Sequence, residues 1–161
     1  MKKYRAPLLV STGVVCMALL TITVLAADNF SGVWKLNLQM SQYNPGPPPK
    51  SLTSRVAVMG DTANFTFDGY DATGKAITPD ELTIKLDGKD YPIAEDPARD
   101  TAAMKKIDDY TTEETNKKGG KVTTITRTVY AKDGKSRTAT TTGTNAQGQM
   151  VNNVAFFDRL R

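Results

Sequence analysis

The stretch from Gly120 to Gly148 reads GKVTTITRTVYAKDGKSRTATTTGTNAQG, and this stretch decides the fold class. It holds two segments rich in Thr, with Val and Ile in the first, separated by an Asp-Gly-Lys sequence at Gly134. Such a sequence favours a tight hairpin turn, because glycine accepts a positive φ without steric cost. Threonine and valine favour strands. The stretch therefore predicts two antiparallel strands, near residues 121–131 and 135–143.

The same turn signal recurs at a regular interval along the chain. Successive turn glycines are separated by 14, 14, 32, 14 and 14 residues. They are Gly60, Gly74, Gly88, Gly120, Gly134 and Gly148. A step of 14 fits one strand and a short turn, and the step of 32 predicts a turn without glycine near 96–100 or at 108–109. Parallel strands need crossovers of a dozen or more residues, so the spacing predicts an antiparallel up-and-down meander.

The segments between these turns alternate apolar and polar residues, as half-buried strands do. Phe65 and Phe67 share one face, and Leu82 and Ile84 share another. We expect ten strands, near 31–39, 50–59, 62–69, 75–86, 89–94, 101–107, 109–117, 121–131, 135–143 and 149–158. An even number lets the first and last strands pair and close the sheet, which removes exposed edges. The alternative is a short helix within 94–107, which would leave nine strands.

The N-terminal residues have the pattern of a secretory signal. A cationic start, MKKYR, precedes an apolar stretch over 6–24, and small residues follow at Ala26 and Ala27. We expect a signal peptide over 1–26 and a single domain over 27–161, exported to the periplasm or beyond the cell. An uncleaved membrane anchor is the alternative, because the apolar stretch is long enough to span a bilayer.

The composition excludes several function classes. The chain has no His, and its one Cys, Cys16, lies in the predicted signal, so His-based triads, Cys nucleophiles and zinc sites are excluded. Adjacent carboxylates such as Glu113 and Glu114 point to opposite faces of a strand and cannot share a substrate. We therefore expect no enzyme, metal or cofactor. Removal of Lys2, Lys3 and Arg5 leaves 18 basic and 17 acidic residues, too balanced for nucleic-acid binding.

The segment Asn29 to Leu36, NFSGVWKL, resembles the Gly-x-Trp start of the lipocalin and calycin barrels. Residues 143–154, GTNAQGQMVNNV, resemble the ending of bacterial secreted lipocalin-like proteins of unassigned function. The resemblance implies an all-β fold, an antiparallel up-and-down meander closed into an 8–10-stranded lipocalin-like barrel. It also implies that Trp34, after Gly32, fills the barrel floor and that Arg159 from the last strand lies across it.

Aromatic residues on inward faces are candidates for a binding site inside such a barrel. Phe65, Phe67, Tyr110 and Tyr130 are the aromatic candidates. Arg127 is the candidate for holding an anionic head group, provided that it faces inward. The fatty-acid-binding proteins carry an Arg-x-Tyr clamp on their last strand, which this sequence lacks.

These features predict an exported barrel that binds a small hydrophobic or amphipathic molecule without chemical turnover. The alternative is a packed barrel that serves as a structural or protein-interaction module of the cell envelope. In that case the Pro-rich segment 45–50 and the turns would form the contact surface.

Overall fold

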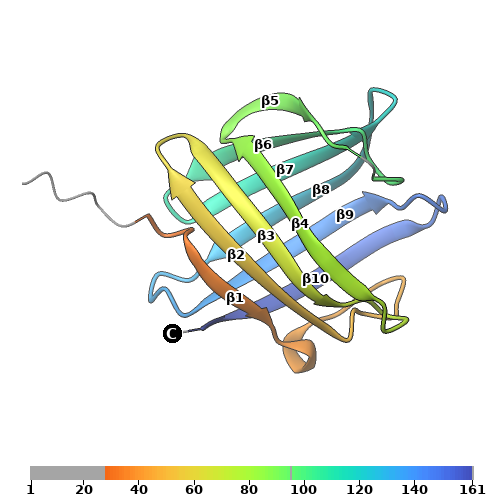
Figure 1. Ribbon diagram of the computed structural model, residues 1–161, viewed down its shortest axis with the longest axis horizontal. Helices are drawn as coiled ribbons and strands as arrows, with labels where there is room; N and C mark the ends of the chain where they lie inside the picture. Colours follow the sequence, from red (N-terminus) through yellow and green to blue (C-terminus); the bar gives the residue numbers. More distant parts are fainter. Residues whose placement is uncertain (1–27, 95, 161) are drawn as a thin grey trace, which may run out of the picture.

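The computed structural model describes residues 28–94 and 96–160, with the backbone alone at 78–80 (Figure 1). The signal peptide predicted over 1–26 lies outside the described residues. The described chain forms ten strands and one short 3-10 helix. They are β1 (Gly32–Leu36), η1 (Leu38–Met40), β2 (Ser51–Met59), β3 (Thr62–Tyr70), β4 (Ala76–Lys85), β5 (Asp87–Pro92), β6 (Thr101–Asp108), β7 (Thr111–Lys118), β8 (Lys121–Tyr130), β9 (Ser136–Thr144) and β10 (Met150–Leu160).

All ten strands belong to one antiparallel sheet in the order β4-β3-β2-β1-β10-β9-β8-β7-β6-β5. The first and last strands pair, with Trp34 opposite Arg159. This pairing bends the sheet so that β2, β3 and β4 cross in front of the strands β8, β9 and β10 (Figure 1). The predicted all-β up-and-down meander and its ten strands are confirmed.

The sheet remains open between β4 and β5. These strands follow each other in the chain but form the two edges of the sheet. Leu86 bridges them at one end: its amide donates to the carbonyl of Asp61 at 2.7 Å, and its carbonyl accepts from the amide of Lys106 at 3.4 Å. The expectation that closure removes every edge is therefore wrong. Strand β5 is six residues long and pairs irregularly with β6, because the register shifts between Asp87 and Asp90.

Two local expectations also need correction. The first strand ends at Leu36 instead of residue 39, because the Asn37 side chain accepts from the amide of Met40 at 3.3 Å and caps η1. The alternative helix within 94–107 is wrong, because Thr101–Asp108 is a strand. Its apolar residues fill the interior of the sheet, and this packing outweighs their helix propensity.

An aromatic cluster lies at one end of the sheet, where the N-terminal segment meets the β6–β7 turn. Trp34 is fully buried there, and its indole N–H donates to the carbonyl of Phe30 at 3.2 Å. The Tyr130 ring makes edge contacts with Phe30 and Trp34, at centroid distances of 5.0 and 5.4 Å. Asn29 donates to the carbonyl of Asp109 at 3.0 Å and ties the segment across this end, which we call the closed end.

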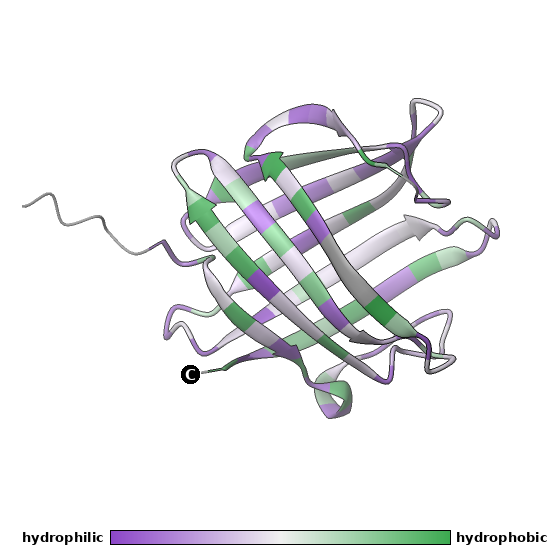
Figure 2. Ribbon diagram, in the orientation of Figure 1, coloured by the Kyte–Doolittle hydropathy of each residue, from purple (hydrophilic) through white to green (hydrophobic). Residues whose placement is uncertain are grey.

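Hydropathy is distributed unevenly between the two sides of the curled sheet. Figure 2 shows strong contrast between apolar and polar residues along β2, whereas β9 is nearly uniform and intermediate. The sequence explains the difference, because β2 reads SLTSRVAVM and β9 reads SRTATTTGT. One side of the interior is therefore supplied by hydrocarbon side chains and the other largely by threonines.

Candidate ligand-binding cavity

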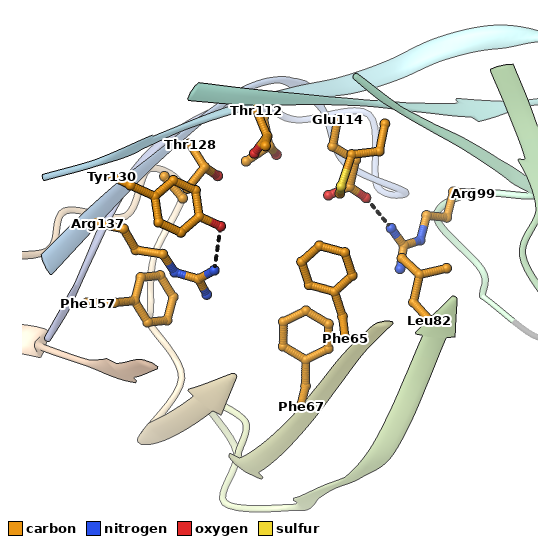
Figure 3. Close-up of a pocket in the computed structure, with 13 residues that line it drawn as sticks. Phe65, Phe67, Leu82, Arg99, Thr112, Glu114, Thr128, Tyr130, Arg137 and Phe157 are labelled. Atoms are coloured by element: carbon orange, nitrogen blue, oxygen red, sulfur yellow. Dashed lines mark hydrogen bonds and ion pairs between the residues drawn. The ribbon is translucent and has the colours of Figure 1, made fainter. Parts of the chain in front are cut away.

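A cavity lies between the two sides of the sheet (Figure 3). About 140 Å³ of it is open to the centre of a water molecule, within about 650 Å³ of space between atoms that includes the open mouth. A cavity of about 140 Å³ is smaller than most small-molecule sites, which measure about 300–1,000 Å³, and it matches an apolar cavity that holds a molecule the size of benzene. Because the mouth is open, a longer molecule would extend beyond the cavity.

One wall of the cavity is hydrocarbon. Phe65 and Phe67 alternate with polar residues along β3, so both rings face inward. The rings stack with centroids 6.3 Å apart and planes 5° apart. Leu82, which pairs with Phe65 across the β3–β4 ladder, extends this wall.

The facing wall carries hydroxyl groups. Thr112 of β7 and Thr128 of β8 pair in register and line the cavity across from the phenylalanines (Figure 3). Thr126 lies beside them, and its hydroxyl bonds to that of Thr141 at 2.9 Å. Met104, opposite Glu114, and Ala139, opposite Thr128, add apolar surface on the same side. The cavity therefore has one apolar wall and one wall that mixes hydroxyl groups with apolar side chains.

Arg137, the second residue of β9, lies at the end of the cavity nearest the closed end, and only 6% of it is exposed. Its guanidinium lies over the rings of Trp34, Tyr130 and Phe157, at 5.3, 5.7 and 4.6 Å from their centroids. Such cation–π contacts are worth about 0.5–2 kcal/mol each. Aromatic faces therefore surround this cation and partly replace its lost water.

Hydrogen bonding leaves Arg137 incompletely satisfied. One terminal nitrogen donates to the Tyr130 hydroxyl at 3.2 Å, while Nε has no partner among the described residues. No described carboxylate forms a salt bridge with it. Burial lowers the pKa of Arg137, yet a guanidinium stays charged in proteins. A buried cation without a counter-ion favours the binding of an anion at this place.

Arg99 borders the cavity at the opposite end, and its charge is already balanced. It lies between β5 and β6 and donates to Glu114 at 2.7 Å, to Asp96 at 2.8 Å and to Asn116 at 2.9 Å. Two carboxylates thus neutralise this guanidinium. Of these two guanidinium groups at the cavity, only that of Arg137 lacks a carboxylate partner among the described residues.

The structure brings together three of the five predicted binding residues: Phe65, Phe67 and Tyr130 line the cavity. The prediction is wrong for Arg127, which is exposed on the outer face of β8, 3.7 Å from Glu113. Because Tyr130 faces inward, alternation sends Arg127 outward.

The prediction is also wrong for Tyr110. It lies in the β6–β7 turn, where its carbonyl accepts from the amide of Tyr130 at 2.8 Å. Its place at the turn keeps its side chain out of the cavity lining.

The closed end contains the three residues assigned to the barrel floor. The guanidinium of Arg159 lies over the Trp34 ring, 5.1 Å from its centroid. It also donates to the carbonyls of Ser31 and Gly134. Gly32 has φ +151°, and a Cβ there would lie 2.7 Å from Nε of Arg159. Glycine at this position thus leaves room for the guanidinium beside the tryptophan.

Sequence reasoning missed Arg137, although the sequence carries a signal for it. The turn at Gly134 pairs Tyr130 with Arg137, and residues directly opposite in a ladder share a face. An inward Tyr130 therefore implies an inward Arg137. Arg99 and Glu114 had no such signal, because their pairing depends on how the β5–β6 connection crosses to β7.

Other kinds of site are not found in the described part of the chain. Residues 28–94 and 96–160 contain no cluster of three or more side chains suited to hold a metal ion. Within the same ranges, no helix is long and apolar enough to cross a membrane.

Comparison with known proteins gives a likeness of structure. No protein-family model matches the sequence, and no curated protein matches it. Among solved structures, the chain is similar to a zebrafish ileal bile acid-binding protein complexed with cholic acid. The sequence identity is 16%, the TM-score is 0.50, and the match covers 83% of this chain and 100% of the other. The chain therefore has a calycin-type fold, in which one antiparallel sheet curls around a central cavity.

Proposed function

We propose that this chain is an exported, non-catalytic binding protein that holds a small amphipathic anion in its cavity. The acid group lies toward Arg137, and the apolar body lies against Phe65 and Phe67. One observation carries the proposal: Arg137 is a buried cation at the cavity surface without a described carboxylate partner. A ligand carboxylate or sulfonate would supply the missing negative charge and accept from the terminal nitrogen of Arg137 that has no partner among the described residues.

The hydroxyl of Tyr130 adds a second contact for the acid group. Its oxygen accepts from Arg137, so its own proton is free to point toward the ligand. Together the guanidinium and the hydroxyl can bind both oxygens of one carboxylate. The aromatic rings around them exclude water, which strengthens these hydrogen bonds.

The structural neighbour supports the ligand class, since it was solved with cholic acid, an amphipathic carboxylate. The export proposal rests on the N-terminal sequence alone, MKKYR followed by the apolar stretch. Expression of the full chain in a bacterial host tests it: the exported protein should have the mass of residues 27–161. Recovery of the unprocessed chain in the membrane fraction would support the anchor instead.

Binding is tested by titrating the purified chain with dodecanoate and with dodecanol, which differ in charge but share the hydrocarbon chain. Calorimetry gives both affinities, and Trp34 fluorescence reports on the closed end. We expect dodecanoate to bind the native chain, and Arg137→Met to weaken it about ten- to a hundredfold, the worth of a hydrogen-bonded charge. Binding of dodecanol should change less than threefold.

Arg127→Met is the matched control, because it removes a guanidinium from the outer face of the neighbouring strand. This variant should bind dodecanoate like the native chain. Equal losses in the two arginine variants would contradict the proposed site. Absence of binding to dodecanoate and to a broad panel of other amphipathic anions would favour the packed structural module.

A further inference from the structure

The two walls of the cavity differ in chemistry, and this difference restricts the ligand further. Phe65 and Phe67 present only hydrocarbon from β3. Thr112 and Thr128 present hydroxyl groups from β7 and β8 on the opposite side (Figure 3). A molecule between them meets only apolar surface on one face, and on the other it meets these hydroxyl groups beside the apolar side chains of Met104 and Ala139.

The β7–β8 register makes the two threonines a pair. Thr112 lies directly opposite Thr128, so their side chains are neighbours on the inner face. Thr112 is only 7% exposed. Neither hydroxyl forms a hydrogen bond with another described residue, whereas the hydroxyl of Thr126 is paired with that of Thr141. Each free hydroxyl can donate one hydrogen bond and accept others.

A plain acyl chain would leave this pair unsatisfied. It would displace the water that can reach the two hydroxyls and offer no polar atom in exchange. Sites that are built to bond a hydroxyl discriminate strongly against the analogue that lacks it, because their own polar groups are then left unpaired. A ligand with hydroxyl groups on the matching face avoids this penalty.

The position of the pair relative to Arg137 shows which part of the ligand it contacts. Thr128 precedes Tyr130 by two residues on β8, and Tyr130 pairs with Arg137. Two residues of strand span about 7 Å. With the acid group at Arg137, the threonines therefore lie beside the body of the ligand.

We propose that the cavity recognises a carboxylate that carries hydroxyl groups along one face and bare hydrocarbon along the other. This inference rests on the proposed function and names the ligand class for the same site. The hydroxylated face lies against Thr112 and Thr128, and the hydrocarbon face lies against Phe65 and Phe67.

A double-mutant comparison with two rigid probes tests the proposal. Cholate carries its hydroxyls on one face, and 5β-cholanate has the same rings and carboxylate without them. Calorimetry below micellar concentration gives the affinity of the native chain and of Thr112→Val/Thr128→Val for each probe. We expect the double substitution to weaken cholate about tenfold or more relative to cholanate, two hydrogen bonds being lost.

Thr140→Val is the matched control, since Thr140 is exposed on the outer face of β9. It should leave the ratio of the two affinities unchanged. Thr128→Val alone, at a less buried position, gives a second measurement if the double variant folds poorly, with about a threefold change in the ratio expected.

The possible results distinguish a failure of the two-faced ligand class from a failure of anion binding itself. If the substitutions leave the ratio unchanged while Arg137→Met still weakens both probes, the two-faced ligand is wrong and anion binding stands. If neither probe binds and dodecanoate does not bind either, the proposed function fails, and the ligand class fails with it.

Discussion

At the scale of single residues, Arg137 opposes the stability of the empty protein. A buried charge costs several kcal/mol unless it is paired, and the contacts of this guanidinium are three aromatic rings and one hydroxyl. Arg137 and Arg159 both lie over Trp34, but Arg159 is satisfied by two backbone carbonyls.

The two arginines should therefore respond oppositely to the same substitution. Arg137→Met is expected to raise the free energy of unfolding by about 1 kcal/mol, because it removes an unpaired buried charge. Arg159→Met should lower it by about 1–2 kcal/mol, because it removes hydrogen bonds and exposes the tryptophan. Urea unfolding in the absence of ligand measures both. A large loss of stability in Arg137→Met would show that this residue is structural.

The sequence was enough to predict the phenylalanines of the apolar wall. It was not enough to predict which arginines face the cavity or which ion pairs they form. Alternation alone places Phe65 and Phe67 on one inward face. Arg127 was misplaced because alternation gives two faces without saying which is inside. That choice depends on a partner strand, and the pairing of Tyr130 with Arg137 settles it. Ion pairs such as Arg99 with Glu114 need the path of a connecting loop, which no local pattern contains.

At the scale of elements, side-chain caps hold the turns between strands. One carboxylate oxygen of Asp71 accepts from the amides of Thr73, Gly74 and Lys75, each at 2.9 Å, and from the Thr73 hydroxyl at 2.7 Å. The uncharged side chain of Asn145 caps its own turn in a similar way, because its oxygen accepts hydrogen bonds from two backbone amides. The turn after β3 is therefore charge-assisted, and the turn after β9 is not.

This difference predicts a pH effect. The hydrogen bond from the Thr73 hydroxyl, helped by the backbone amides, lowers the pKa of Asp71 from its ordinary value of 3.8. Stability from a lowered pKa is present above 3.8 and is lost as the pH falls through the folded-state value. Asp71→Asn should therefore lose less stability than the native chain between pH 7 and about pH 2.5. Urea midpoints at the two pH values test this, and identical losses would contradict it.

Glycines within strands have a different role from those in turns. Gly143 of β9 has φ +137°, and a Cβ there would collide with the carbonyl of Thr123 on β8. Gly148, in the next turn, also has positive φ but faces open space. Gly143→Ala should cost about 3 kcal/mol or more, and Gly148→Ala about 1 kcal/mol. Thermal unfolding measures the difference, and equal losses would contradict the role of the close strand approach.

The sequence allowed the hairpins to be predicted, because each turn signal is local. Asp133-Gly134-Lys135 and its equivalents fix where strands end within a few residues. The 3-10 helix after β1 was missed because it depends on Asn37, whose side chain caps it and donates to Asp158 of the last strand at 2.8 Å. The open edge at β5 was missed because the turn signals show where strands end but not whether β5 pairs with β4, and it does not.

At the scale of the whole molecule, the strands are held unequally. β1 is paired on both sides, whereas β4 and β5 are each paired on one side only. Edge strands open more readily, since fewer hydrogen bonds must break. The two sides of the sheet can separate most easily between β4 and β5, and the ligand proposed above would enter there.

Hydrogen exchange should follow this order. We expect the amides of β4 and β5 to exchange at least tenfold faster than those of β1 and β10, and mass spectrometry of the native chain resolves the segments. Addition of a tightly bound ligand should slow exchange on both sides of the gap. Uniform exchange across the ten strands would show that the molecule opens only as one cooperative unit.

The pairing of β1 with β10 also governs when the molecule can form. Asn37 and Asp158, joined by a hydrogen bond, are 121 residues apart in the chain, so β1 can pair with β10 only after all the strands between them have been synthesised. Proteins dominated by such distant contacts fold slowly. A nascent polypeptide of this kind stays unfolded at least until β10 has been synthesised. For the export proposed above, this delay would let the chain cross a narrow translocation channel before the cavity forms.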